Sequence, residues 1–250
     1  MAAVDVKILV FGHSDSDGSH LPDADDAWPW LLRRLLAEQG VEAEVVHKRL
    51  FASQTAVAFV ERQLDVEQPE FVIIATSTFP CLVKMVSKRV RRRFGARAGA
   101  VASKAERFVA PHRGPPGSDR ARGMLPVRRA GRRLIGTAGD YTFDELVSSY
   151  QACFAAVARR ERTQAIVIGG AAYTEAIWRL NPGSDVLEAA CNEALRRSAL
   201  THHFDWVFHE ELLGGRGGKA PFYMADGCHT LQPAHTLLAA ALAPLVPAHV

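Results

Sequence analysis

Two short segments near opposite ends of the chain contain residue types that could do chemistry together. The first is the loop Gly12-His13-Ser14-Asp15-Ser16-Asp17-Gly18, and the second is Asp226-Gly227-Cys228-His229. A serine hydroxyl becomes a good nucleophile when a neighbouring imidazole removes its proton, and a carboxylate can fix the tautomer of that imidazole. The three-residue spacing lets Asp226 reach the His229 ring within one turn. These residue types therefore indicate a triad of Ser14, His229 and Asp226.

Other uses of these segments stay open at this stage. Backbone N–H groups could cradle a phosphate in the first loop, but Asp15 and Asp17 would repel it. His13 with the same two carboxylates could form a metal site, and Ser14 could be a turn serine that bonds its own backbone. In the second segment, Asp226 could cap the last helix beside a surface histidine. We expect neither a metal nor a cofactor.

Short aliphatic runs alternate with amphipathic segments along the chain. We expect strands at Val6–Phe11, Ala43–His47, Phe71–Ala75, Ala165–Ile168 and Trp206–His209. We expect helices at Trp28–Gln39, Ala56–Leu64, Phe143–Arg160, Val186–Ala199 and Ala234–Leu245. Such alternation predicts an α/β fold, a three-layer α/β/α sandwich around a mainly parallel five-stranded sheet. Ligands of such sheets bind at the carboxyl ends of the strands, where the first loop lies.

The two segments resemble the first and last sequence blocks of the SGNH (GDSL) hydrolases. The first block of that family is Gly-Asp-Ser-x-x-x-Gly, and the last is Asp-x-x-His before the C-terminal helix. Here His13 stands where aspartate is usual, and Thr230 stands where proline is usual. The resemblance covers nearly the whole chain and implies a single domain of flavodoxin-like SGNH hydrolase fold. It also implies that Ser14 is the nucleophile, His229 the base and Asp226 the residue that orients it.

The resemblance further implies an oxyanion hole made by the serine N–H, a glycine N–H and an asparagine side chain. Ala52, after the second strand, is the best match for the glycine. The loop after the third strand has no asparagine, so we expect Ser77 to supply a hydroxyl instead, with Thr76 and Thr78 as the alternatives. His13 is either a structural replacement or a donor or second base beside Ser14.

The net charge of +3 conceals a strong asymmetry along the 250 residues. Between Lys84 and Arg133, sixteen lysines and arginines stand against two acids, while the remainder carries −11. A helix is expected at Leu82–Phe94, and Ala96–Arg133 reads as the least ordered part of a surface excursion at about 84–135. Such a field would attract an anionic partner, such as an acyl carrier protein, a coenzyme A thioester, an acidic small substrate or an anionic membrane surface. A merely solvated cationic face is the alternative, and nucleic acid is not expected because no reader motif is present.

The overall composition narrows the class of protein. With 48% hydrophobic and 23% charged residues, the chain is neither disordered nor fibrous. No apolar run is long enough for a membrane helix, and the first residues lack the features of a secretory signal. Four scattered cysteines fit reduced thiols in a cytoplasmic protein, namely Cys81, Cys153, Cys191 and Cys228.

The sequence therefore predicts a hydrolase that cleaves a carboxylic ester or thioester through an acyl-enzyme on Ser14. The same intermediate could pass its acyl group to an alcohol or amine instead of water. The alternative is a catalytically weak protein of this fold that serves in binding or as a scaffold. The missing asparagine and the altered first block favour that alternative.

Overall fold

The structure is a computed structural model that describes residues 6–109, 134–135, 137–170, 173–214, 222–224 and 226–246. The chain divides into two compact units. One comprises Met1–Thr78 together with Phe143–Val250, and the other is Phe79–Thr142. The second unit contains the cationic segment that begins at Lys84.

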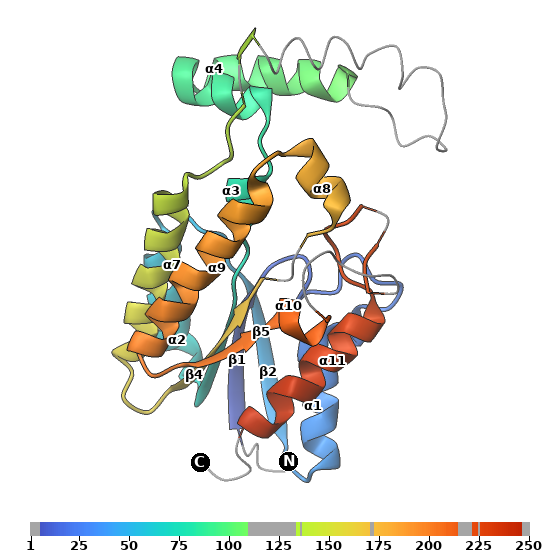
Figure 1. Cartoon of the computed structure of the whole chain (residues 1–250). Helices are drawn as coiled ribbons and strands as arrows, with labels where there is room; N and C mark the ends of the chain where they lie inside the picture. Colours follow the sequence, from blue (N-terminus) through green and yellow to red (C-terminus); the bar gives the residue numbers. More distant parts are fainter. Residues whose placement is uncertain are drawn as a thin grey trace. The chain divides into compact units, whose positions relative to one another are not determined.

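A five-stranded parallel sheet forms the centre of the first unit (Figure 1). Its strands are β1 (Val6–Gly12), β2 (Ala43–Arg49), β3 (Phe71–Ala75), β4 (Gln164–Gly169) and β5 (Asp205–Phe208). Their order across the sheet is β2-β1-β3-β4-β5, and every neighbouring pair is parallel. In the register, Val10 lies opposite His47 on one side and Ile73 on the other. The predicted fold class is confirmed.

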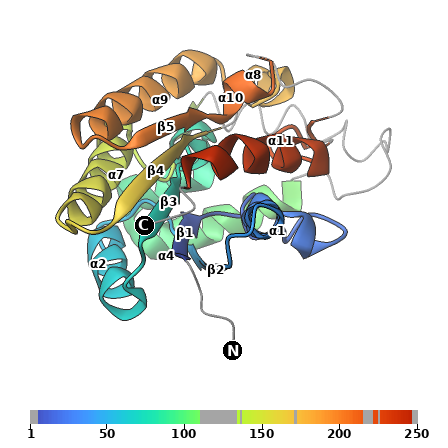
Figure 2. The ribbon, with the colours of Figure 1, turned by 90° about the horizontal axis from the view of Figure 1, so that it is seen from below.

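Helices cover both faces of this sheet (Figures 1 and 2). One face is covered by α1 (Trp28–Glu38) and α11 (Gln232–Leu242), and the other by α2 (Ala56–Glu67), α7 (Phe143–Ala158) and α9 (Ser184–Thr201). Side chains alternate between the faces because successive residues of a strand point in opposite directions. Thus Ile8 and Val10 join the core beneath α1 and α11, whereas Phe11 packs edge-on against Phe59 of α2.

Short elements complete the first unit at the ends of the longer ones. They are η1 (Ala24–Asp26), α8 (Glu175–Leu180), α10 (His209–Leu212) and η2 (Ala243–Leu245). Of these, α10 directly follows β5 and packs against α11 and β4. This contact places His209 in the buried part of the unit.

The second unit contains α3 (Phe79–Leu82) and the long cationic helix α4 (Val86–Val109). A kink at Gly95 (φ 85°, ψ 177°) interrupts α4, because only glycine adopts this backbone conformation readily. The expectation of little order from Ala96 onward is wrong as far as Val109, which ends the helix. Alanine, lysine and arginine dominate this stretch and all have high helix propensity. The rest of the expected excursion, 110–133, lies outside the described residues.

Three of the four cysteines are buried, and Cys228 is partly exposed. All four are free thiols, as the sequence predicts. Within the part of the chain that the structure describes, no helix is both long and apolar enough to cross a membrane.

Candidate active site

The loops that follow three adjacent strands bring most of the predicted site residues to one edge of the sheet. Ser14 follows β1, which lies between β2 and β3. Ala52 follows β2 and Ser77 follows β3. Because the strands are parallel, their carboxyl ends meet at this edge, and the segment before α11 adds His229 and Asp226.

The structure brings Ser14, His229 and Asp226 into one hydrogen-bonded chain. Ser14 Oγ lies 3.1 Å from His229 Nε2, and His229 Nδ1 lies 2.7 Å from Asp226 Oδ2. The Asp226 carboxylate also accepts the backbone N–H groups of Cys228 and His229, at 3.0 and 3.1 Å. Partial burial alone would raise the pKa of Asp226, but these hydrogen bonds bring it down to about 2. Asp226 is therefore an anion at neutral pH and can stabilise a charged His229.

The first loop is built so that Ser14, rather than the neighbouring Ser16, faces His229. Ser16 is fully buried, its hydroxyl donates to the His13 carbonyl oxygen at 2.7 Å, and it lies 2.9 Å from His47 Nε2 of β2. A Cβ atom at Gly12 would lie only 1.9 Å from Ser16 Oγ. The loop can therefore fold back on itself only because residue 12 is glycine, and Ser14 is left at its outer side.

The second loop turns Asp226 back onto His229. Gly227 lies between them with a positive φ of 74°, a conformation that favours glycine. A Cβ atom at this position would come within 2.1 Å of Thr174 Oγ1, and the Gly227 carbonyl oxygen accepts the Thr174 N–H at 3.0 Å. Glycine is therefore required at position 227, both by the positive φ and by the close approach of Thr174.

Of the expected oxyanion donors, Ala52 is buried and Ser77 is half-buried. The Ser77 N–H donates to the Tyr150 hydroxyl of α7 at 3.0 Å. The next residue after Ala52, Ser53, donates its N–H to Ser149 Oγ of the same helix, also at 3.0 Å. Helix α7 therefore anchors both loops. The Ser77 N–H is engaged there, and the Ser77 hydroxyl interacts with the Tyr173 side chain.

His13 makes contacts that favour its structural interpretation. Its Nδ1 accepts the Asp15 N–H at 3.4 Å, and its ring also interacts with the Thr76 backbone. Burial lowers the pKa of His13, although the Asp15 charge opposes this. These partners are groups other than Ser14, so the geometry favours a structural role for His13 over that of a second base.

A buried carboxylate links the two loops, and the sequence analysis did not identify it. Asp15 accepts hydrogen bonds from the Thr230 N–H at 3.0 Å and from the Thr230 hydroxyl at 2.9 Å. Proline at position 230, usual in the family that the sequence resembles, could supply neither donor. Burial would raise the pKa of Asp15, but nearby imidazoles and the Thr230 N–H lower it below its usual value. No local feature of the sequence marks this pair, because the two residues are 215 positions apart.

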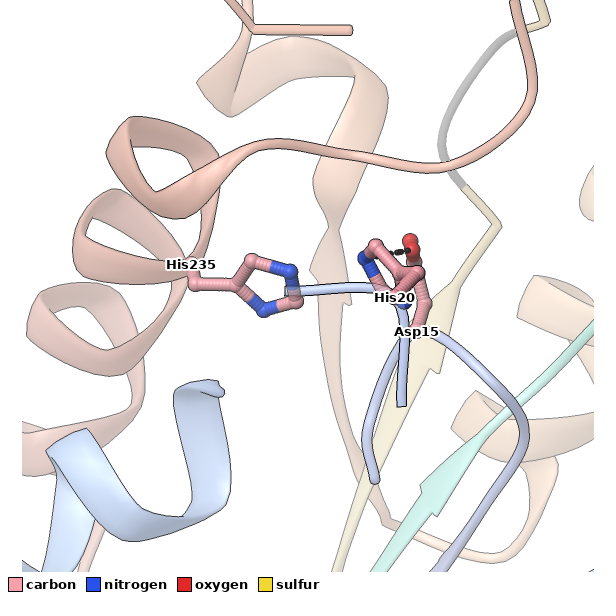
Figure 3. A group of neighbouring side chains, drawn as sticks. All are labelled: Asp15, His20 and His235. Atoms are coloured by element: carbon pink, nitrogen blue, oxygen red, sulfur yellow. Dashed lines mark ion pairs between the residues drawn. The ribbon is translucent and has the colours of Figure 1, made fainter. Parts of the chain in front are cut away.

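Two groups of side chains place several possible metal ligands close together. Asp15, His20 and His235 form the first (Figure 3), with ligand atoms within 4.8 Å of one another, and Asp226, Cys228 and His229 form the second. In the first group, both carboxylate oxygens of Asp15 already accept hydrogen bonds from Thr230. The second group is the candidate triad itself. We therefore assign no metal or cofactor to either.

Several solved structures have a fold similar to that of this chain. No protein-family model and no curated protein matches the chain by sequence. The fold is similar to a lipase/acylhydrolase from Enterococcus faecalis, with 14% identity, a TM-score of 0.61 and coverage of 96% of this chain and 94% of that one. It is similar to TesA, with 18% identity, a TM-score of 0.55 and coverage of 96% and 99%. It is also similar to the acetylxylan esterase Axe2 from Geobacillus stearothermophilus, with 14% identity, a TM-score of 0.56 and coverage of 98% and 96%. These likenesses confirm the predicted three-layer α/β/α fold over nearly the whole chain.

Proposed function

We propose that the protein is a serine hydrolase that cleaves a carboxylic ester or thioester through an acyl-enzyme on Ser14. The observation that carries the proposal is the unbroken chain of hydrogen bonds from Ser14 through His229 to Asp226. The proteins of the same fold add support, since they include a lipase/acylhydrolase and an acetylxylan esterase.

The reaction follows from the order of these three groups. Ser14 Oγ attacks the carbonyl carbon while His229 Nε2 takes its proton, and Asp226 stabilises the resulting imidazolium. The tetrahedral intermediate then breaks its bond to the alcohol or thiol, which leaves with the proton from His229. Water attacks the acyl-Ser14 ester with His229 again as base, releasing the carboxylic acid and the free serine. An alcohol or amine in place of this water would give acyl transfer.

The developing oxyanion needs donors that are already in place. We assign this part to the N–H groups of Ser14 and Ala52 and to the Ser77 hydroxyl, which stands in for the asparagine of the family. His13, the other residue expected here, lines the same loop but has its own partners. Loss of one donor lowers kcat by about 10²–10³ in enzymes of this kind. If the oxyanion hole lacks effective donors, the protein is a catalytically weak binding or scaffold protein, which is the second candidate function.

Labelling with a fluorophosphonate probe tests the proposal directly. We expect the probe to form one adduct, located on Ser14 by peptide mass spectrometry, and Ser14→Ala to abolish it. Ser19→Ala is the matched control, because Ser19 is an exposed serine of the same loop. Absence of any adduct on the folded wild-type protein would contradict the hydrolase and favour the scaffold.

The proposed acyl donor is an anionic one, such as an acyl carrier protein or a coenzyme A thioester. The support is the charge of the second unit, where α4 carries most of the described basic residues.

A further inference from the structure

His20 lies where the two loops of the candidate site meet, and the mechanism above does not use it. Its Nδ1 is 3.0 Å from the carbonyl oxygen of Ser14. Its Nε2 is 2.9 Å from the carbonyl oxygen of Thr230, the residue after His229. One imidazole therefore bridges the backbone of the nucleophile and the backbone beside the base, which are more than 200 residues apart in sequence.

The chemistry of these two contacts fixes the protonation form of the ring. A carbonyl oxygen can only accept a hydrogen bond, and a neutral imidazole has only one N–H to donate. Both contacts are hydrogen bonds at the same time only when His20 is an imidazolium. The Asp15 carboxylate offsets this charge, with Oδ1 at 3.3 Å from His20 Nε2 (Figure 3).

Asp15, His229 and His235 are titratable groups that face His20. Asp15 comes from the same loop, His229 from the second loop and His235 from α11, whose side chain extends toward the first loop (Figure 3). The ring centroids of His229 and His235 lie 4.8 and 5.7 Å from that of His20. Burial lowers the pKa of His235, and Thr230 holds Asp15 in its anionic form. The nearest fixed charge to His20 among these groups is therefore negative.

We infer that His20 is a positioning residue whose imidazolium form ties the Ser14 loop to the His229 loop. Loss of either link loosens the contact between Ser14 Oγ and His229 Nε2. The effect on the labelling rate rests on the proposed function. The protonation of the His20 bridge can be measured without it. A displacement of about 1 Å in a catalytic group can lower the rate by about 10².

Two substitutions of His20 each retain one of its two hydrogen bonds and remove its positive charge. The amide of His20→Asn reaches about as far as Nδ1 and can still donate to Ser14, while that of His20→Gln reaches about as far as Nε2 and can still donate to Thr230. We expect each to lower the rate of fluorophosphonate labelling by roughly 10–100-fold. Urea unfolding of the same variants shows whether each is folded, so that a lower labelling rate of the folded protein reports a loss of positioning.

The control is His203→Asn, which changes an exposed histidine after α9 in a left-handed conformation that asparagine tolerates. It should retain the wild-type labelling rate. A wild-type labelling rate in both folded His20 variants would overturn the inference, because a merely structural residue would change stability and leave that rate in place.

A measurement on the unaltered protein separates this inference from the proposed function. In ¹⁵N-histidine-labelled wild-type protein, NMR should show hydrogen on both ring nitrogens of His20 at neutral pH. A hydrogen-free nitrogen there would overturn the bridge, whether or not the variants fold. If both nitrogens carry hydrogen and the probe still forms no adduct on Ser14, the bridge stands and the proposed hydrolase falls.

Discussion

Thr230, in the second loop, donates two hydrogen bonds to the buried Asp15 carboxylate of the first loop. Its hydroxyl and its N–H occupy both oxygens of Asp15. Thr230→Val keeps the shape and the N–H but removes the hydroxyl, so it leaves one oxygen of a buried anion without its donor. We expect the free energy of unfolding to fall by about 1–3 kcal/mol, and Thr230→Pro, which removes both donors, to cost more.

Urea unfolding measures these losses. Thr236→Val is the matched control because Thr236 is exposed on α11 and its hydroxyl donates to the carbonyl oxygen of Gln232 in the same helix. It should change stability by no more than about 0.5 kcal/mol. Equal losses at Thr230 and Thr236 would show that the Asp15 contact contributes nothing.

The same residues show what the sequence could predict about the site. Ser14, His229 and Asp226 were predicted because each lies in a short pattern whose spacing is itself informative, and the structure brings them together. Asp15, His20 and His235 belong to no such pattern. Their contacts with Thr230 arise only when the first and last loops meet, so no local feature of the sequence reveals them.

At the scale of elements, α4 of the second unit carries the charge that we propose to recruit the acyl donor. Within that unit, Lys88 Nζ and Arg91 Nη2 lie 2.6 and 2.8 Å from the two oxygens of Asp140. Charge reversal at these positions would break an internal ion pair. Arg93 and Arg97 are exposed on the same helix and are the better positions to change.

The double variant Arg93→Glu/Arg97→Glu should raise KM for a carrier-bound or coenzyme A-bound substrate and leave a small neutral ester unaffected. Raising the salt concentration should weaken the wild-type preference, since exposed charges are screened over about 8 Å at physiological ionic strength. Arg33→Glu/Arg62→Glu, on α1 and α2, changes the net charge equally and is the control. Equal KM values for all three proteins would leave α4 as a merely solvated face.

The bounds of the strands were predicted more accurately than the extent of helix α4. The strand β3 has the predicted bounds, and the other strands differ by one or two residues, because a buried parallel strand is a nearly continuous aliphatic run. The second half of α4 was missed because its glycines and cationic side chains show no apolar stripe. Its helix propensity, rather than its hydrophobic pattern, was the informative feature.

At the scale of the whole molecule, the first unit contains several ionisable groups whose burial favours one protonation form. His209 of α10 is one of them, and burial lowers its pKa to about 4, against a usual value near 6.5. Among the residues that the structure describes, no group hydrogen-bonds its Nε2. The folded protein therefore resists protonation of His209, whereas the unfolded chain does not.

This difference makes the stability of the fold depend on pH in a definite direction. Above pH 6.5, His209 is neutral in both states and the full stability is present. As the pH falls from 6.5 to 4, the unfolded chain binds a proton that the folded protein does not, so stability is lost, by about 3 kcal/mol in all. Below pH 4, Asp226 adds a further loss in the same direction, because its folded pKa is about 2.

Urea unfolding at pH 7.0, 5.5 and 4.5 tests this dependence with His209→Gln, which fills most of the same space and does not titrate. We expect the wild type to lose stability steadily over this range and the variant to lose distinctly less, since its side chain binds no proton in either state. His203→Asn, at an exposed position, should follow the wild type. Parallel slopes for the wild type and His209→Gln would mean that the folded protein opens locally to admit the proton, and that acid stability is set instead by the buried Asp15 and the imidazoles around it.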